Sequence, residues 1–332
     1  MIRTVCSLAI VFVMTKVLAV VNTSLMDAYL NGAEAKIIYK VVDDEGRPVE
    51  DATAHIWFRN THPKLVIDDW VMNTDSNGIF IAEYRTNDRL SCGIDKPGYY
   101  HTFDRVTFSD PQEYKVVKEG KWIPYGNTRV MVLKRIKNPV LHSSSDGRTV
   151  YQIPSWGEWL GFDLLLRDWI SPYGNGRHND VLLRFNKQEI TKYHQIRTMD
   201  VAFTNNLYAG AYVMTKDSFS DMDTDYIANT NKRFQAYFTF RFEQIRRIGL
   251  ERSETIRDEL SENQYMVFRT RTKVEHNGNL LSCHYGIIHG NWRFYEKGGM
   301  SIGRVLFNCT PNDTNLEDQK TLLQAQRMRG GR

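Results

Sequence analysis

Three segments of this 332-residue chain decide its fold. Residues 41–58 read VVDDEGRPVEDATAHIWF, residues 73–84 read NTDSNGIFIAEY, and residues 92–100 read CGIDKPGYY. Apolar and polar residues alternate on both sides of short turns, which predicts half-buried strands. The Asn77-Gly78 pair is expected to form a type I′ hairpin turn, because Asn and Gly tolerate the positive φ angles of that turn. The first half of the chain is therefore predicted to be β-structure, and none of these residues is expected to do chemistry.

The same segments carry a resemblance to a known family. They contain the patterns G-x-P-V-x-x-A, T-D-x-x-G-x-F and K-P-G-Y, formed here by Gly46, Pro48, Val49, Ala52, Thr74, Asp75, Gly78, Phe80, Lys96, Pro97, Gly98 and Tyr99. Over residues 35–136 the chain resembles the carboxypeptidase regulatory-like (transthyretin-like) β-sandwich domain. The resemblance implies a β-sandwich in an exported protein, and the matching residues are turn formers and core residues. It implies no peptidase activity.

Length and composition extend the β prediction to the whole chain. The length suits two domains, and 42% hydrophobic with 25% charged residues allows a buried core in each. Aromatic residues, at 12%, favour strands. We expect an all-β protein, with a transthyretin-like or Ig-like β-sandwich over residues 35–136 and a second, larger β-sandwich over residues 153–313, for which a jelly-roll is one option. Residues 137–152 are expected to be a linker and residues 314–332 a flexible tail.

The first residues and the net charge indicate the compartment. Residues 1–19 combine a basic start with an apolar run too short to span a bilayer, which predicts a cleaved signal peptide and a secreted, periplasmic or cell-surface protein. The formal charge of +4 falls to +2 once Arg3 and Lys16 are removed. We therefore expect neither a nucleic-acid surface nor a membrane span after cleavage.

Two strand patterns in the second half predict which side chains face solvent. From Arg233 to Phe242, odd positions are polar or Tyr while even positions are mostly Phe, so one face is core. A long hairpin is expected around Asn277-Gly278, with Arg271 opposite His284. This register places Arg269, Arg271 and His284 on an exposed face, and Cys283 and Cys309 on apolar faces where they are disulfide candidates. Two free buried thiols are the alternative for the cysteines.

The exposed faces suggest ligands. Trp156 and Trp159, close to Asp163 and Asp168, are a residue set that can hold a sugar through ring contacts and hydrogen bonds. Paired acids could also hydrolyse a glycosidic bond. Residues 162–169 read as one strand, however, which would put the two Asp residues on opposite faces. The basic residues of the hairpin could bind an anionic group such as a uronic acid or phosphate, or could simply be solvated.

Motifs for catalysis or metal binding are not convincing. No histidine begins a zinc-peptidase pattern, and the G-x-S-x-G match at residues 299–303 is followed by a strand, whereas a nucleophile elbow needs a helix there. Residues 221–225 imitate the start of a calcium loop but lack its Gly and Glu, which leaves only a looser calcium site open. No metal, cofactor or catalytic residue is predicted.

The sequence therefore predicts an exported, non-catalytic binding module for carbohydrate or a cell-envelope polymer. A glycoside hydrolase or lyase with its site in the second sandwich is one alternative, and a structural adhesion component that pairs through strand edges is another. The second half also resembles secreted bacterial proteins of unassigned function. It shares with them YGNG at residues 173–176, the strand Phe268-Arg269-Thr270-Arg271, and the closing TPNDTNLE at residues 310–317. That resemblance implies no activity.

Overall fold

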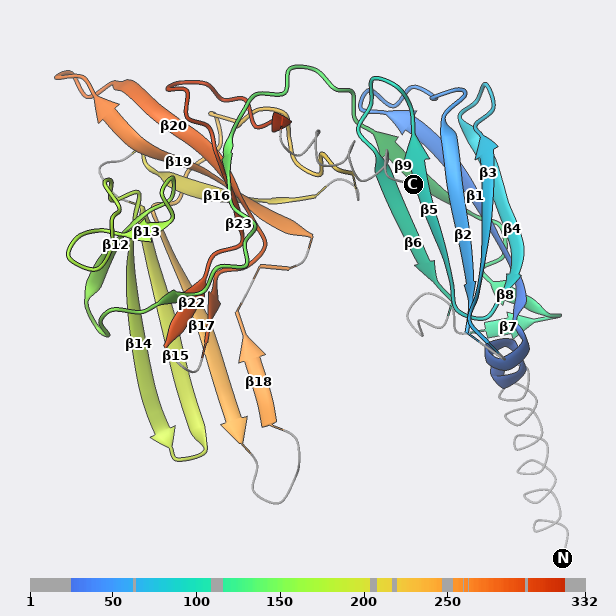
Figure 1. Ribbon diagram of the computed structural model, residues 1–332, viewed down its shortest axis with the longest axis horizontal. Helices are drawn as coiled ribbons and strands as arrows, with labels where there is room; N and C mark the ends of the chain where they lie inside the picture. Colours follow the sequence, from blue (N-terminus) through green and yellow to red (C-terminus); the bar gives the residue numbers. More distant parts are fainter. Residues whose placement is uncertain are drawn as a thin grey trace, which may run out of the picture. The chain divides into compact units, whose positions relative to one another are not determined.

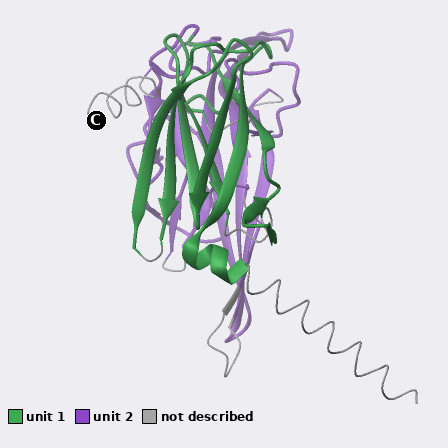
Figure 2. Cartoon of the chain, turned by 90° about the vertical axis from the view of Figure 1, so that its right-hand side faces the viewer, with its two compact units in different colours: residues 1–136, 218–223 green, residues 137–217, 224–332 purple. Residues whose placement is uncertain are grey.

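The protein is nearly all β (Figure 1) and divides into two compact units. Unit 1 comprises residues 1–136 and 218–223, and unit 2 comprises residues 137–217 and 224–332 (Figure 2). No helix in the described part of the chain is long and apolar enough to cross a membrane. The computed structural model describes residues 25–61, 64–108, 116–203, 208–216, 220–246, 253–258, 260–261, 263–295 and 298–319.

Unit 1 is a sandwich of two sheets preceded by a short helix at residues 25–31. In one sheet the first strand, β1, pairs antiparallel with β4 on one edge and parallel with β9 and β8 on the other, and β7 follows β8. The second sheet has the order β3-β2-β5-β6. The strands are β1 (Ala33–Asp43), β2 (Thr53–Asn60), β3 (Val66–Asn73), β4 (Ile79–Thr86), β5 (Arg89–Asp95), β6 (Thr102–Thr107), β7 (Val116–Lys118), β8 (Lys121–Ile123) and β9 (Asn127–Leu133).

The core of unit 1 follows the alternation predicted from the sequence. In β2, Ala54, Ile56 and Phe58 are fully buried while the intervening side chains are half-buried. The alternation of β9 places Met131 and Leu133 in the same core. One cluster of buried residues therefore joins both sheets, and the first half of the chain is a β-sandwich.

The predicted hairpin at Asn77-Gly78 is wrong. Strand β3 before the turn pairs with β2, whereas β4 after it pairs with β1, so the turn carries the chain from one sheet to the other. Only Gly78 has a positive φ, of 72°. The Asp75 carboxylate accepts the N–H groups of Asn77 and Ile79 and thereby stabilises a different turn.

Unit 2 contains three sheets. A five-stranded sheet has the order β10-β23-β20-β19-β16, a six-stranded sheet the order β13-β12-β14-β15-β17-β18, and a small sheet the order β11-β22-β21. The strands are β10 (Ser143–Ser144), β11 (Tyr151–Gln152), β12 (Trp159–Asp163), β13 (Asp168–Trp169), β14 (Val181–Thr191), β15 (His194–Phe203), β16 (Gly210–Thr215), β17 (Tyr237–Arg246), β18 (Ser253–Arg257), β19 (Gln264–Val274), β20 (Leu280–His289), β21 (Arg293–Phe294), β22 (Gly299–Ser301) and β23 (Arg304–Phe307).

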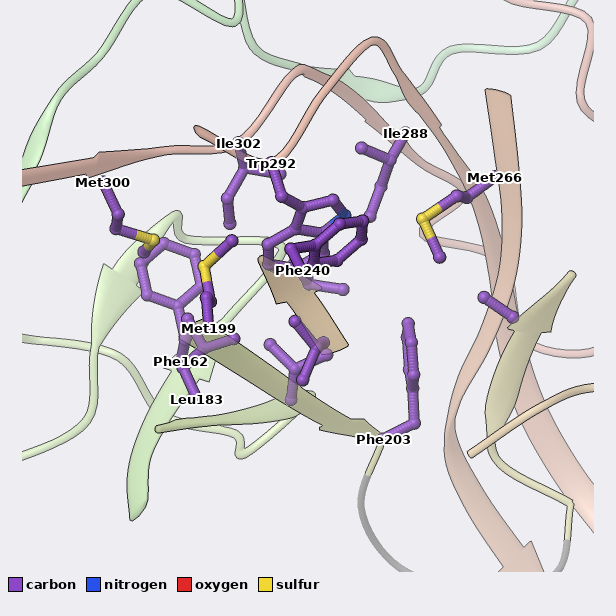
Figure 3. Close-up of a cluster of buried hydrophobic side chains, with 14 of the residues drawn as sticks. Phe162, Leu183, Met199, Phe203, Phe240, Met266, Ile288, Trp292, Met300 and Ile302 are labelled. Carbon is purple, nitrogen blue, oxygen red and sulfur yellow. The ribbon is translucent and has the colours of Figure 1, made fainter. Parts of the chain in front are cut away.

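A large apolar core lies between the five-stranded and six-stranded sheets (Figure 3). The six-stranded sheet contributes Phe162, Leu183, Met199 and Phe240, among others. The five-stranded and small sheets and the loop before β21 contribute Met266, Ile288, Trp292, Met300 and Phe307. The second half of the chain is therefore also a β-sandwich.

The five-stranded sheet is covered on its other face as well. A second cluster contains Tyr212, Tyr265, Val267, Cys283, Tyr285 and Ile287 from its strands. Ala228, Phe234 and Leu316, from segments that form no sheet, pack on them. The sheet is consequently the middle layer of unit 2, and residues 265–270 of β19 and 285–288 of β20 are buried on both faces.

Several predicted boundaries differ from the structure. Residues 253–257, in a charged stretch of the sequence, form the edge strand β18, which pairs with β17. The predicted linker, residues 137–152, contains β10 and β11, which pair with β23 and β22 of unit 2. The predicted tail begins with ordered structure, because the buried Glu317 carboxylate accepts the N–H groups of Lys137 and Asn138. The predicted signal peptide (residues 1–19) and residues 320–332 lie outside the described residues.

Candidate ligand-binding face

The six-stranded sheet presents one face to the core and the other to solvent. In β17, Phe240 and Phe242 are buried, whereas Tyr237, Thr239 and Arg241 are exposed. This is the alternation that the sequence predicted for residues 237–242. The outward side chains of β12, β14, β15 and β17 form the surface that we call the outer face.

One row of side chains crosses the outer face from strand to strand. Trp159 of β12 lies opposite Arg184 of β14, Arg184 opposite Asp200 of β15, and Asp200 opposite Thr239 of β17. Directly opposed residues on neighbouring strands are within contact distance of each other. The row therefore joins one aromatic ring, one ion pair and one hydroxyl into a continuous strip.

Asp200 holds the row together. Its carboxylate accepts hydrogen bonds from the Arg184 guanidinium at 2.9 and 3.1 Å and from the Thr239 hydroxyl at 2.8 Å. Burial alone would raise the pKa of Asp200, but hydrogen bonds from Thr239, Tyr237 and Arg184 outweigh it and lower that pKa. The carboxylate therefore stays charged and fixes the side chains around it.

Two aromatic rings meet above this strip. The rings of Trp159 and Tyr237 lie 6.3 Å apart, inclined by 70°, and the Arg184 guanidinium lies 4.6 Å from the Trp159 ring. Trp159 is 39% exposed and Tyr237 is 50% exposed. Rigid aromatic rings beside fixed polar groups offer both apolar contact and directional hydrogen bonds.

A second polar cluster lies farther along the same strands. Glu243 of β17 accepts from Arg241 at 2.8 Å, and one of its oxygens lies 2.6 Å from His194 Nε2. Asn186 and Thr198 are opposed on β14 and β15, and Thr198 lies opposite Arg241, so these residues form the row next to the first one. The outer face thus continues as a polar strip.

The structure separates the two tryptophans that the sequence grouped. Trp156 packs on Phe294 at 5.4 Å, and Phe294 belongs to the core between the sheets. Trp159 packs on the outer face instead. Trp156 is 41% exposed, so the two residues have similar exposure but belong to different surfaces.

The sequence suggested that Asp163 and Asp168 lie on one strand, but the structure places them on two. A turn at residues 164–167, where Arg167 has a φ of 58°, makes them direct partners on β12 and β13. Asp163 is fully buried and accepts the N–H groups of Leu165, Leu166, Arg177 and His178. Asp168 accepts from Trp169 and Asn175. Both carboxylates hold loops in place through these hydrogen bonds.

The basic patch predicted on the hairpin is also not a surface. Arg269 pairs with Tyr285 and Thr270 with His284, and a bulge at Arg271, which has a φ of 52°, shifts the register beyond them. Arg269 is buried, with its guanidinium 4.1 Å from the Phe234 ring. Arg271 turns inward onto buried acids. The hairpin belongs to the middle layer of unit 2, which explains why these cations are covered.

His284 is half-buried with them. Its Nδ1 lies 3.1 Å from the backbone oxygen of Asn308, and its ring lies 5.6 Å from that of Phe307. Burial is the main cause that lowers the pKa of His284, and the nearby positive charge of Arg271 adds to the effect. A neutral, covered imidazole does not suit the anion site proposed from the sequence.

The predicted disulfide between Cys283 and Cys309 is wrong, since both cysteines are free. Phe307 of β23 lies opposite Gly286 of β20, and this register, continued by two residues, places position 309 opposite position 284. Adjacent positions 283 and 284 point to opposite faces of a strand. Cys283 is accordingly buried in the second cluster, which covers the other face of the five-stranded sheet. Cys309 is exposed, and Cys92 is a core residue of unit 1.

The functional candidates missed by sequence reasoning are Tyr237, Arg184, Asp200 and Thr239. The exposed face of residues 237–242 was recognised, although the strand begins at Tyr237 and not at Arg233, and Phe234 packs in the second cluster. The neighbours of this face were not recognised, because strand order cannot be read from alternation.

The motif candidates offer no further chemistry. Ser301 of the G-x-S-x-G match is buried in β22, 3.1 Å from the Tyr295 hydroxyl. Within the described ranges, no three His, Cys, Asp or Glu side chains are grouped so that they could hold a metal ion. Residues 221–225 are included in that statement.

Comparison with known proteins gives no family. No family model matches the chain, and no curated protein matches it. Among solved structures, it is similar to 3-chlorocatechol 1,2-dioxygenase from Rhodococcus opacus 1CP at 14% identity, covering 32% of this chain and 62% of that one, with a TM-score of 0.25. It is also similar to catechol 1,2-dioxygenase from Acinetobacter radioresistens at 13% identity, covering 32% of this chain and 54% of that one, with a TM-score of 0.27.

A third similar structure is a mutant of the shaft pilin SpaA from Lactobacillus rhamnosus GG. The identity is 9%, the match covers 54% of this chain and 91% of the pilin chain, and the TM-score is 0.22. The match covers only 62% and 54% of the two dioxygenase chains. The fold of the present chain, a pair of all-β sandwiches, therefore rests on its own sheets and cores.

Proposed function

We propose that this protein is an exported, non-catalytic binding module and that the outer face of unit 2 binds carbohydrate or a cell-envelope polymer. The observation that carries the proposal is the row Trp159–Arg184–Asp200–Thr239 with Tyr237 above it. Exposed aromatic rings next to fixed hydrogen-bonding groups suit a sugar, whose ring faces are apolar and whose edges carry hydroxyls.

A binding role is favoured over catalysis by the state of the acids. Asp200 and Glu243 on the outer face are each engaged by two or more partners. The hydrogen bonds to Asp200 lower its pKa, which opposes service as a general acid near neutral pH. Of the two acids singled out from the sequence, Asp163 is fully buried and Asp168 accepts backbone N–H groups of Trp169 and Asn175. These contacts support a structural role for Asp200 and Glu243, which hold neighbouring side chains in position.

We infer that unit 1 is an accessory domain of the carboxypeptidase regulatory-like type. Supporting this, the motif residues form turns and core. Phe80 is buried against Tyr39 with ring centroids 4.9 Å apart, and the Thr74 hydroxyl donates to the backbone oxygen of Val49. A Cβ atom on Gly78 would overlap the carbonyl oxygen of Val41, so this position requires glycine.

A glycan-binding array with the wild-type protein and three variants tests the function. We expect Trp159→Ala and Tyr237→Ala each to weaken binding about tenfold or more, which corresponds to ~1.4 kcal/mol. Trp156→Ala is the matched control, because it removes a tryptophan of similar exposure that packs on Phe294 and lies outside the outer face. Its affinity should stay within about threefold of wild type.

Circular dichroism and thermal unfolding would show that each variant is folded. Absence of binding to every glycan would overturn the proposal. Equal losses in Trp159→Ala and Trp156→Ala, with folding intact, would show that the outer face is not the site.

A further inference from the structure

We infer that the outer face selects a neutral, hydroxyl-rich polymer and rejects acidic ones; this inference rests on the proposed function and names the ligand class of the same face. The reason is that the charges on the face are already compensated by one another. Arg184 is paired with Asp200 at 2.9 Å. Arg241 is paired with Glu243 at 2.8 Å.

The formal charges of these four groups cancel, since two guanidinium groups and two carboxylates are present. His194 shares Glu243, with 2.6 Å between the nitrogen and the oxygen. Recognition of carboxylate or sulfate normally uses Arg groups that can offer a bidentate fork to the ligand. Here the guanidinium groups of Arg184 and Arg241 already bond to Asp200 and Glu243 of the protein itself.

An acidic ligand would also meet these acids directly. A uronate or sulfate beside Asp200 or Glu243 places like charges together, and such juxtaposition is costly. Acidic polymers are therefore disfavoured at both clusters.

Neutral sugars face no such penalty. A sugar hydroxyl both donates and accepts, so it can bond to a carboxylate, a guanidinium, an amide or a threonine without displacing an ion pair. Asn186, Thr198 and Thr239 supply uncharged groups beside the two ion pairs. Tyr237 and Glu243 are six positions apart on β17, which corresponds to about 20 Å of strand. That length suits several successive sugar rings, so a polymer fits better than a single sugar.

Affinity electrophoresis of the whole protein tests the inference. The neutral probes are mixed-linkage β-glucan and galactomannan, and the acidic probes are polygalacturonate and heparin, each at 50 and 500 mM NaCl. We expect retardation by at least one neutral probe, lost in Trp159→Ala and retained in Trp156→Ala. The apparent affinity should change less than about threefold between the two salt concentrations, because no counterions are released.

Two variants probe the compensation itself. Asp200→Asn and Glu243→Gln keep the shape of each side chain but free Arg184 and Arg241 from a negative partner. We expect each variant to gain salt-sensitive binding to polygalacturonate, by threefold or more at 50 mM NaCl. Two variants are used so that a folding defect in the more buried Asp200→Asn leaves the other as a test. If every folded variant binds polygalacturonate no better than wild type, the compensation argument is wrong.

The outcomes separate the two ideas. Trp159-dependent binding to an acidic probe that weakens tenfold or more with salt would keep the binding face and overturn its neutral specificity. An absence of Trp159-dependent binding to all four probes would count against the proposed function itself, and the neutral specificity would fail with it.

Discussion

The guanidinium of Arg271 and the carboxylate of Asp163, 108 positions apart in the chain, form an ion pair of 3.0 Å in the interior of unit 2. Arg271 also donates to both carboxylate oxygens of Asp180, which is fully buried. Backbone N–H groups and the Thr270 hydroxyl supply further donors to the two acids. Two residues that looked like ligand contacts in the sequence thus link β19 to β12 and to the segment before β14.

Removal of Arg271 should strongly destabilise unit 2. Arg271→Ala leaves Asp163 and Asp180 buried without their counter-charge, and loss of one partner of a buried ion pair costs about 3–5 kcal/mol. Urea unfolding measures this change. Arg241→Ala, which breaks an ion pair on the outer face, is the control and should cost less than about 1 kcal/mol. Similar midpoints for Arg271→Ala and wild type would show that the cluster contributes little.

Acid should weaken unit 1 through Asp43. Burial would raise the pKa of Asp43, but hydrogen bonds from Arg47, Glu45 and Arg135 lower it to about 2. Because the folded pKa lies below the unfolded value of 3.8, the stabilisation is present above pH 4 and is lost as the pH falls towards 2. The loss should amount to about 1–2 kcal/mol.

The measurement is hydrogen exchange of β1 amides against pH, with Asp43→Asn as the control. The variant should be less stable at pH 7 but should lack this component of the acid response. An identical pH response in both proteins would contradict the assigned role of Asp43.

Two glycine substitutions should separate backbone strain from steric overlap in unit 1. Gly46 and Gly78 both have a positive φ, of 80° and 72°. A Cβ on Gly46 meets no atom within 4 Å, whereas one on Gly78 would overlap the backbone of Val41. Gly46→Ala should cost about 1–2 kcal/mol from the left-handed conformation alone. Gly78→Ala should cost a further ~1–3 kcal/mol. Thermal unfolding compares them, and equal costs would show that the turn can move away from β1.

Native alkylation should distinguish the cysteines. Cys309 is exposed, whereas Cys92 and Cys283 are buried. Burial raises the pKa of Cys283, which reduces its thiolate further. Iodoacetamide followed by peptide mass spectrometry should label Cys309 first, and Cys92 and Cys283 only after unfolding. A peptide linked through Cys283 and Cys309 in the non-reduced protein would refute the free-thiol assignment.

Much of the fold could be predicted from alternation alone. Ala54, Ile56 and Phe58 are core residues, and Phe240 and Phe242 face inward, because a period of two assigns faces wherever one side is buried. Alternation did not identify the buried face of β9, where Val130 is 61% exposed while Met131 and Leu133 are buried. Both faces of that strand carry apolar residues, so the pattern alone could not decide between them.

The candidate site could be predicted only in part. Trp159 was recognised from its residue type, but its partners Arg184, Asp200 and Tyr237 come from three other strands, and their alignment depends on sheet order and register. The hairpin prediction failed for a related reason. The bulge at Arg271 shifts the register beyond Thr270, and a covering layer made of distant segments buries what looked like an exposed face.

Because β1 pairs with β9, the first sheet of unit 1 can be completed only late during synthesis of the unit. These strands pair in parallel from Ile37–Asn127 to Asp43–Leu133, so the first strand of unit 1 receives its last neighbour some 90 residues later. Ser220, which forms a bridge with Thr102, arrives later still. While the chain emerges from the ribosome, one edge of β1 lacks its partners β8 and β9 until residues 121–133 have been made. Nascent unit 1 is therefore open to a chaperone or to mispairing for longer than its size alone implies.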